Sequence, residues 1–252
     1  MQRAAATDAH TSRADQHPAR TFVPAAVLFD FDGVIVHSEP LHLLAFQTVA
    51  AEEKIELTED EYYRDLIGFD DKGAWRFLFE KQGRELDPKT FLRVMTRKSE
   101  VMREQIERRA YHALPGVEEF VRGLWRSVPL GICSGALREE IELMLEGVAL
   151  RDCFSVITAA EDVDVGKPDP RGYVLTAQRI AEKMSRKLLR PAQCLVIEDA
   201  VSVATRAQEA GFAVLGVATT YPQPAWPAEI LTVPSLKPED VLKVLPKLPI
   251  LE

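Results

Sequence analysis

Short apolar segments alternate with helix-like segments over the second half of the chain, and this alternation constrains the fold more than any other feature of the sequence. The apolar segments predict buried strands, which are PLGIC (129–133), SVIT (155–158), CLVI (194–197) and AVLGV (213–217). Segments of helical periodicity accompany them at 117–126, 137–147, 171–184 and 203–211. Repeated strand–helix units favour a parallel sheet with helices on both faces. We therefore predict a doubly wound, Rossmann-like α/β core.

A further strand and a helical block come before this alternating region. Residues 26–30 predict a short buried strand that ends in an acidic turn. From residue 41 to residue 112 only helical periodicity is found, and Asp87-Pro88 is typical of the start of the last helix. The predicted domains are an α/β catalytic core formed by 22–38 and 116–252, and an inserted all-helical cap formed by 39–115.

Composition restricts the partners and the location of the protein. The net charge is −8 and no basic block is present, so we expect no binding to nucleic acid. No apolar run reaches the ~20 residues that a membrane span needs, so we expect no membrane association. The three cysteines form no CxxC pair, which indicates reduced thiols in a cytoplasmic protein. Residues 1–21 predict a disordered tail, and we expect a monomer or weak dimer.

Acidic, basic and hydroxyl side chains follow the predicted strands at the points where the strands end. They are Asp30 and Asp32 after the first strand, Ser134 and Gly135 after the second, Lys167 in the loop after the third, and Glu198 and Asp199 after the fourth. The carboxyl ends of parallel strands form the ligand-binding edge of a doubly wound sheet. We therefore expect these residues to lie close together.

The two carboxylates of Asp30 and Asp32 lie one residue apart and repel each other unless a cation is close to them. Clustered oxygen ligands suit Mg²⁺, which binds a few carboxylates together with phosphate. Lys167 would balance the remaining negative charge, and Ser134 with nearby backbone N–H groups would donate to phosphate oxygens. An aspartate beside such a phosphate can attack phosphorus and form an aspartyl-phosphate. The pattern therefore predicts phosphoryl transfer with Mg²⁺ as the cofactor.

Four motifs resemble those of a known enzyme family. The segments DFDGVIVHSEPLH, CSGA, GKPDP and VIEDA are similar to the four motifs of the haloacid dehalogenase-like hydrolases, in the same order. More narrowly, they resemble the branch with a helical (C1) cap after the first motif, which contains β-phosphoglucomutase-like proteins and small-metabolite phosphatases. The resemblance covers roughly residues 25 to 220 and implies a Mg²⁺-dependent enzyme.

The resemblance implies a role for each matching residue. Asp30 would be the nucleophile, and Asp32 would protonate the leaving group and then activate water. Lys167 would bind phosphate and steady Asp30, while Ser134 and Gly135 would bind phosphate. The implied ligands of Mg²⁺ are Asp30, the backbone carbonyl of Asp32, Glu198 and Asp199. His42 matches the histidine of the SEPLH segment, near the hinge into the cap, and is a candidate substrate-binding residue.

The chain departs from the family pattern in the first and fourth motifs. His37 stands where the family commonly has aspartate, a departure that concerns the turn into the cap. Ala200 and Val203 stand where serine and glycine are common after the Glu-Asp pair. These two departures concern the geometry of the loop that follows the implied metal ligands.

A third departure concerns the substrate. In β-phosphoglucomutases a cap arginine, three residues after a glycine, holds the distal phosphate. Here Asp71 stands three residues after Gly68, and an acid would repel a second phosphate. Lys72 or Arg76 could substitute, and both are candidate substrate-binding residues of the cap.

These observations predict a Mg²⁺-dependent phosphatase that hydrolyses a small phosphorylated metabolite through an aspartyl-phosphate. The nearest alternative is a sugar-phosphate mutase of the β-phosphoglucomutase type, which returns the phosphoryl group to another hydroxyl. Dehalogenation of a 2-haloacid needs no Mg²⁺, and the presence of Asp32 and the Glu198-Asp199 pair counts against it. A binding protein without activity is a further alternative, and Mg²⁺-dependent release of phosphate would exclude it.

Overall fold

Six strands form one parallel sheet in the computed structural model, which describes residues 22–66, 69–185 and 188–250. The predicted tail at 1–21 lies outside the described residues. The strand order is β3-β2-β1-β4-β5-β6, with β1 Ala26–Phe29, β2 Leu130–Cys133, β3 Phe154–Thr158, β4 Cys194–Glu198, β5 Ala213–Val217 and β6 Leu231–Val233. This sheet confirms the doubly wound α/β fold. Strand β1 pairs with β2 and β4, so the predicted site begins at the centre of the sheet.

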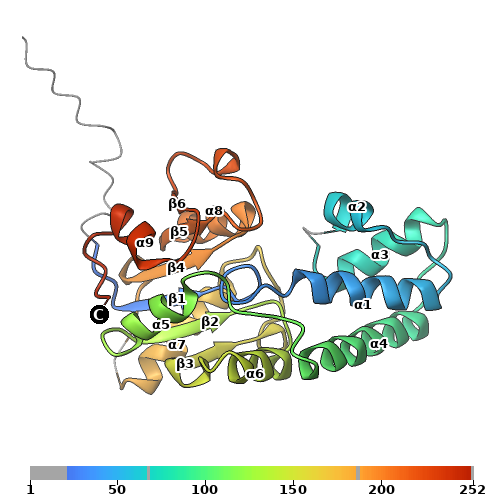
Figure 1. Ribbon diagram of the computed structural model, residues 1–252, viewed down its shortest axis with the longest axis horizontal. Coiled ribbons are helices and arrows are strands. Elements are labelled where there is room, and N and C mark those ends of the chain that lie inside the picture. Colours follow the sequence, from blue (N-terminus) through green and yellow to red (C-terminus); the bar gives the residue numbers. More distant parts are fainter. Residues whose placement is uncertain (1–21, 67–68, 186–187, 251–252) are drawn as a thin grey trace, which may run out of the picture.

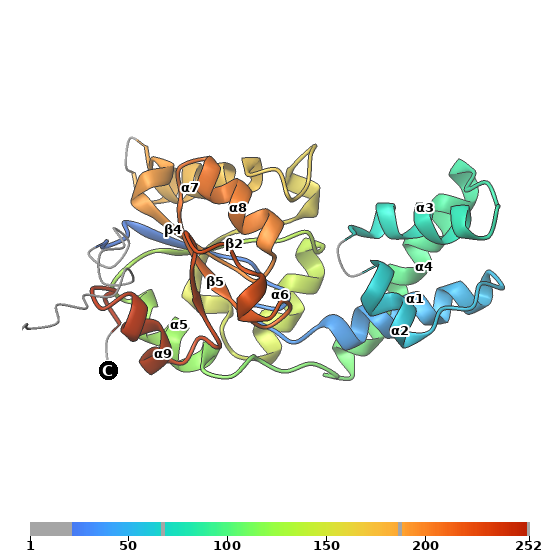
Figure 2. The same ribbon diagram turned by 90° about the horizontal axis from the view of Figure 1, so that it is seen from above.

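Helices cover both faces of the sheet, as Figure 2 shows. They are α5 Val117–Trp125, α6 Arg138–Gly147, α7 Arg171–Lys183, α8 Val201–Glu209 and α9 Pro238–Val244. Because side chains alternate along a strand, β1 supplies both layers of the core. Val27 and Phe29 pack in the cluster that includes α5, α6 and α9, whereas Ala26 and Leu28 pack in the cluster that includes α7 and α8. Both sides of the strand are fully buried, which explains its unbroken apolar sequence.

The sequence analysis did not predict β6 or α9. Strand β6 has only three residues, two of them half-buried, and it pairs in parallel with β5. A run this short shows no periodicity, so its pairing depends on the adjacent edge of the sheet. Short 3₁₀ turns complete the core at Arg151–Cys153, Ala160–Asp162, Pro191–Gln193 and Gln223–Ala225.

The inserted segment is helical, as expected. It contains α1 Glu39–Glu52, α2 Glu59–Glu61, a π-helical segment Tyr62–Leu66, α3 Asp71–Lys81 and α4 Pro88–Glu107. Helix α4 begins where the sequence indicated, because Asp87 accepts hydrogen bonds from the backbone N–H groups of Lys89 and Thr90. Phe46 of α1 and Trp75 of α3 lie with ring centroids 5.1 Å apart, so aromatic packing joins these helices. The cap projects from the core (Figure 1).

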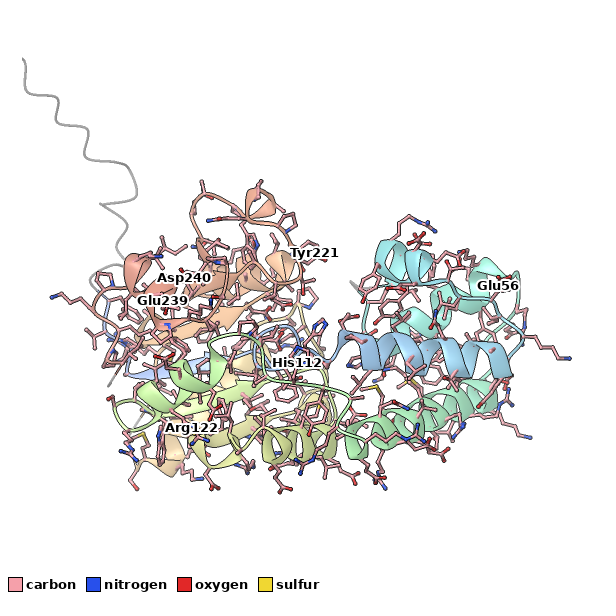
Figure 3. The ribbon with its side chains drawn as sticks, in the orientation of Figure 1. Glu56, His112, Arg122, Tyr221, Glu239 and Asp240 are labelled. Atoms are coloured by element: carbon pink, nitrogen blue, oxygen red, sulfur yellow. The ribbon has the colours of Figure 1, made fainter. Side chains whose placement is uncertain are left out.

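Two chain segments connect the core to the cap, and they lie side by side. Val36 forms an antiparallel bridge with Ala113, and the N–H of His37 donates to the carbonyl of His112 at 3.0 Å. The imidazole rings of the two histidines lie 5.3 Å apart. Figure 3 shows His112 at the side of the core from which the cap projects. His37, which departs from the family pattern, therefore contacts the returning segment.

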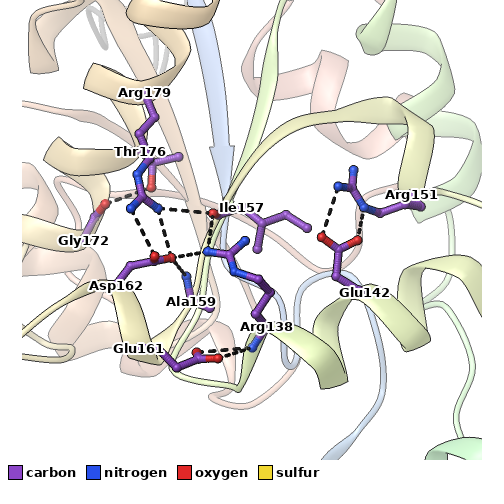
Figure 4. Close-up of polar contacts among 10 residues, drawn as sticks. All are labelled: Arg138, Glu142, Arg151, Ile157, Ala159, Glu161, Asp162, Gly172, Thr176 and Arg179. Carbon is purple, nitrogen blue, oxygen red and sulfur yellow. Dashed lines mark hydrogen bonds and ion pairs between the residues drawn. The ribbon is translucent and has the colours of Figure 1, made fainter.

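A cluster of ion pairs anchors the chain that follows β3 (Figure 4). Asp162 binds both Arg138 of α6 and Arg179 of α7, and it also accepts a hydrogen bond from the N–H of Ala159. Both arginines donate to the carbonyl of Ile157. This cluster fixes the start of the loop that carries the predicted phosphate-binding lysine between β3 and α7.

Within the described ranges, no helix has the length and apolar character required to cross a membrane. The cysteines Cys133, Cys153 and Cys194 are buried and form no disulfide. Burial raises the pKa of the Cys133 thiol to about 12, so this thiol stays protonated near neutral pH.

Candidate active site

Three carboxylates converge at the carboxyl ends of β1 and β4. Phe29 of β1 pairs with Ile197 of β4, so Asp30 lies beside the next residues of β4. One carboxylate oxygen from each of Asp30, Glu198 and Asp199 lies within 4.8 Å of the others. All three side chains are buried, with Glu198 completely inaccessible to solvent. The sheet therefore concentrates negative charge where the sequence predicted it.

Lys167 places its ammonium group among these carboxylates. Its Nζ lies 2.5 Å from Asp30 Oδ1 and 2.7 Å from Glu198 Oε1. Burial by itself would lower the pKa of Lys167, but the charges of Asp30 and Glu198 outweigh burial and raise it. Lys167 is therefore a cation that is held against the predicted nucleophile.

Glu198 is surrounded by hydrogen-bond donors. Its Oε1 accepts from Lys167 Nζ and, at 3.0 Å, from the hydroxyl of Tyr173. Its Oε2 accepts from the backbone N–H groups of Asp199 and Ala200, each at 2.9 Å. These four donors orient the carboxylate toward Lys167 and into the start of α8. Ala200 thus contributes its backbone to the site, although its side chain has no hydroxyl.

Asp199 is held by a residue that the sequence analysis did not single out. The hydroxyl of Thr220, in the loop after β5, donates a hydrogen bond to Asp199 Oδ2. The neighbouring Thr219 hydroxyl donates to the carbonyl of Gly33 at 2.6 Å. Gly33 has a φ of +74°, and a Cβ there would lie 2.0 Å from Asp199 Oδ2. Glycine at position 33 therefore lets the loop after β1 approach Asp199.

The other departure from the family pattern in the fourth motif, Val203, lies in α8. Its side chain is only 7% exposed and packs in the cluster beneath α7 and α8. Valine at this position therefore contributes to the packing of α8 and is not a polar partner of the carboxylates.

The carboxylates carry an excess of negative charge that a cation would relieve. Burial raises the pKa of Asp30, the charges of Glu198 and Asp32 raise it too, and Lys167 lowers it, with a net pKa of about 7. Burial, Glu198 and Asp30 raise the pKa of Asp199 well above its usual range. An all-oxygen donor set of this kind fits a hard divalent cation. Asp30 and Asp199 have the oxygens best available for it, because those of Glu198 already accept four hydrogen bonds.

Asp32 lies in a different environment from Asp30. The hydroxyl of Ser38 donates to Asp32 Oδ1, and the hydroxyl of Ser134 lies 3.4 Å from Oδ2. His42 Nε2 lies 3.8 Å from Oδ1. Burial alone would raise the pKa of Asp32, but His42 and Ser38 outweigh burial and lower it. The two aspartates of the DxD motif thus differ in pKa: that of Asp32 is lowered, whereas that of Asp30 is about 7 when no metal ion is bound.

The segment after β2 supplies hydrogen-bonding groups at the same edge of the sheet. The Ser134 hydroxyl accepts a hydrogen bond from the N–H of Ala136 at 2.9 Å, in addition to its contact with Asp32. Gly135 is exposed, and a Cβ built on it would have no neighbour within 4 Å. Open space therefore lies in front of this backbone, as a phosphate-binding turn requires.

A chain of polar contacts leads from Asp32 into the cap. His42 Nδ1 lies 3.1 Å from the Nζ of Lys98 on α4. Lys98 is 2% exposed, and its Nζ binds both carboxylate oxygens of Asp71 at 2.7 Å. The ammonium also lies 4.6 Å from the centroid of the Phe46 ring. Asp71, the departure noted in the sequence, therefore forms an ion pair with a buried lysine.

The structure does not bring Lys72 and Arg76 into this group. Both side chains are exposed. The guanidinium of Arg76 lies 6.0 Å from the centroid of Phe91, which is in the first turn of α4. The opposite end of α4 contacts the core, since Arg103 pairs with Glu139 of α6 at 2.5 Å. Arg103 lies twelve positions after Phe91 along the helix, a rise of about 18 Å.

Four residues of the site were missed in the sequence analysis: Ser38, Lys98, Tyr173 and Thr220. Thr220 follows the end of β5, so the strand-end argument could have included it. Lys98 lies among Val94, Val101 and Met102 on the buried face of α4, and a lysine on an apolar face is a signal of a buried charge partner. Ser38 and Tyr173 carry no comparable signal.

A parallel, Rossmann-like sheet with buried carboxylates and a lysine at its central strand ends, together with an inserted helical cap, defines a class of Rossmann-like enzymes that have a cap domain. Residues 27–217 match the family model of the haloacid dehalogenase-like hydrolases. The chain therefore belongs to this family, as the motifs indicated, and is an enzyme of the hydrolase type.

Several similar proteins are named as phosphatases. The chain is 28% identical over 224 residues to a phosphorylated carbohydrates phosphatase of Thermotoga maritima, covering 87% of this chain and 97% of that protein. It is 28% identical over 179 residues to the fructose-1-phosphate phosphatase YqaB of Escherichia coli, covering 70% and 87%.

Solved structures share the fold. CbbY from Rhodobacter sphaeroides, in complex with phosphate, superposes with a TM-score of 0.74 at 20% identity, covering 85% of this chain and 95% of that one. The β-phosphoglucomutase of Clostridium difficile gives a TM-score of 0.72 at 19% identity, covering 88% and 96%. At these identities the likeness concerns the fold alone.

Proposed function

We propose that the protein is a Mg²⁺-dependent phosphatase that hydrolyses a small phosphorylated metabolite through an aspartyl-phosphate on Asp30. The observation that carries this proposal is the buried Asp30 carboxylate, 2.5 Å from Lys167 and within 4.8 Å of an oxygen of Asp199. A structural ion pair would not need further buried acids around it, because each added carboxylate costs desolvation. Similarity to named phosphatases of small phosphorylated substrates supports the same function.

Each charged residue has a task in this reaction. A carboxylate oxygen of Asp30 attacks phosphorus while the bond from phosphorus to the ester oxygen breaks, and protonated Asp32 gives its proton to that oxygen, so that the alcohol is released. Lys167 stabilises the charge on the transferring phosphoryl group, and the Ser134 hydroxyl donates to one of its oxygens. Water then attacks the phosphorus of the aspartyl-phosphate, and Asp32 accepts its proton while Asp30 leaves. Asp32 thus regains from water the proton that it gave to the leaving group, and its lowered pKa favours the ionised form that enters this second step.

Asp30 and Asp199 would hold Mg²⁺ together with the backbone carbonyl of Asp32, and Glu198 would orient Lys167 and the start of α8. When bound, Mg²⁺ would neutralise charge on the phosphate and on the nucleophile. It would also return the pKa of Asp30 to the acidic range, so that the nucleophile is ionised at neutral pH.

The mutase alternative requires a cationic group that holds the far end of a bisphosphate. Lys72 and Arg76 are exposed, and Arg76 packs over Phe91 at the end of α4 away from the core. The buried cation Lys98 is paired with Asp71. This arrangement favours transfer of the phosphoryl group to water over transfer to a second hydroxyl.

The test is an assay of the purified protein with p-nitrophenyl phosphate, with Mg²⁺ and with EDTA. We expect release of phosphate only with Mg²⁺, and a loss of at least ~10³-fold in Asp30→Asn, because an amide is a poor nucleophile. Asp60→Asn removes one carboxylate from the exposed surface of the cap and serves as the matched control. Activity in Asp30→Asn above a few per cent of wild type would refute the assignment of the nucleophile.

A second arm separates the phosphatase from the mutase. The protein is given β-glucose 1-phosphate with a trace of β-glucose 1,6-bisphosphate, and both free phosphate and glucose 6-phosphate are measured. We expect phosphate to dominate. Isomerisation faster than hydrolysis would assign the mutase activity instead.

The same proposal includes the environment of the protein. Three buried cysteines without a disulfide and a net charge of −8 support a cytoplasmic enzyme that does not bind nucleic acid. Fractionation of the source cells and multi-angle light scattering would test this location and the expected monomer or weak dimer.

A further inference from the structure

The ion pair between Asp71 and Lys98 joins α3 to α4 in the cap and has one buried partner. Lys98 is almost completely buried, whereas the side chain of Asp71 is 38% exposed. Both Asp71 oxygens lie 2.7 Å from Lys98 Nζ, so the pair has its cation inside and its anion outside. An incoming molecule would therefore meet the carboxylate before the ammonium.

The pair lies on the cap side of the catalytic acids. Lys98 Nζ contacts His42 Nδ1 at 3.1 Å, and the other nitrogen of His42 lies 3.8 Å from Asp32. Asp71 is thus three contacts away from Asp32. The N-terminal end of α3, where Asp71 is the first residue, lies on the side of the cap that is nearest the core (Figures 1 and 2).

Other groups around the pair add little positive charge. Glu140 of α6 lies near His42, Lys98 and Asp32, and burial raises its pKa. Burial and Lys98 act to lower the pKa of His42, but the contact with Asp32 outweighs them and raises it. Lys98 faces Asp71, which is its counter-ion, and His42 faces Asp32, so these contacts leave little positive charge for an incoming molecule.

We infer that Asp71 is a specificity-determining residue that selects phosphate monoesters whose far end is uncharged, such as polyol or sugar monophosphates. This inference rests on the proposed phosphatase function of the same site. Asp71 neutralises the buried cation of the cap and presents a carboxylate outward, which repels a second phosphate or a carboxylate on the substrate. A substrate hydroxyl, in contrast, can donate a hydrogen bond to Asp71.

The test compares two substrates that differ only at the far end. Glycerol 3-phosphate ends in a hydroxymethyl group, and 3-phosphoglycerate has a carboxylate in its place. We measure kcat/KM for both and take their ratio, because the ratio cancels any effect of a variant on the phosphoryl-transfer step. Wild type should favour glycerol 3-phosphate, and Asp71→Asn should reduce this preference about tenfold, since the unpaired ammonium of Lys98 then attracts the carboxylate.

One further variant tests the direction of the change in substrate preference, and another serves as a control. Lys98→Met leaves Asp71 without its counter-ion, so the preference for glycerol 3-phosphate should increase. Asp60→Asn removes a cap carboxylate outside this pair and should leave the ratio unchanged. Circular dichroism and thermal unfolding establish that each variant is folded, and Lys98→Met still tests the inference if Asp71→Asn does not fold.

The outcomes separate this inference from the function on which it rests. If wild type hydrolyses neither substrate nor p-nitrophenyl phosphate, the phosphatase function fails. If wild type hydrolyses them but Asp71→Asn and Lys98→Met leave the ratio as in wild type, the phosphatase stands and the role of Asp71 is refuted.

Discussion

Thr220 offers a sharp test of how the loop after β5 supports the proposed metal site. Its hydroxyl donates to Asp199 Oδ2, and Asp199 is only 6% exposed, so water cannot readily replace this donor. In Thr220→Val a methyl group of similar size takes the place of the hydroxyl. The Asp199 carboxylate then loses the contact that fixes its orientation. Part of the free energy of metal binding must be used to restore that orientation, so the metal binds more weakly.

The size of the effect follows from the lost contact. A hydrogen bond to a charged group contributes about 1.5–3 kcal/mol, and loss of a partner that orients a metal ligand typically weakens binding about 10- to 100-fold. We therefore expect the Mg²⁺ dissociation constant of Thr220→Val to rise about 10- to 100-fold. Isothermal titration of the metal-free protein measures this constant without any assay of activity.

Two variants control the experiment. Thr220→Ser retains the hydroxyl and should bind Mg²⁺ as wild type does. Thr205→Val removes a hydroxyl that only donates to the carbonyl of Val201 within α8, so it matches the chemical change away from the site. Titration curves of Thr220→Val that overlay those of wild type would refute the reasoning.

Two other predictions concern the same group of acids. Gly33→Ala should weaken Mg²⁺ binding and destabilise the protein by about 1–2 kcal/mol, because alanine is strained at φ +74° and its Cβ would lie 2.0 Å from Asp199 Oδ2. Chemical unfolding measures this loss, and unchanged stability would contradict the geometry. Because the pKa of Asp30 is raised from 3.8 to about 7, protons compete with Mg²⁺ below about pH 7, and affinity should fall about tenfold for each further pH unit. The folded state holds the proton of Asp30 more tightly than the unfolded chain does. The metal-free protein should therefore lose stability as the pH rises from about 3.8, the unfolded pKa of Asp30, to about 7, its folded pKa. A melting temperature that increases with Mg²⁺ more at pH 8 than at pH 5.5 would agree, whereas equal increases would not.

Local sequence was enough to predict the fold class. The five strands from β1 to β5 appear as short apolar runs because both sides of each lie under helices, and buried parallel strands need little polar alternation. The periodicity of apolar residues predicts the helices, and the capping residue Asp87 also predicts where α4 begins. Strand β6 has only three residues, too few to show an apolar run that predicts a strand.

The residues at the strand ends were also readable from the sequence. Position at the end of a buried strand determines that a side chain lies at the ligand-binding edge, and parallel order determines that the edges coincide. The structure accordingly brings Asp30, Lys167, Glu198 and Asp199 together. The different environments of Asp30 and Asp32 were not readable, because they depend on burial and on partners distant in sequence.

What only the tertiary structure decided is which side chains become partners. The sequence itself determined that position 71 is acidic, which suggested repulsion of a second phosphate. It did not reveal that the acid pairs with Lys98, 27 residues away on another helix. The same is true of Thr220 and Asp199, which lie 21 residues apart. Secondary structure follows from short-range periodicity, but the pairing of charges depends on how separate elements pack and how much water that packing excludes.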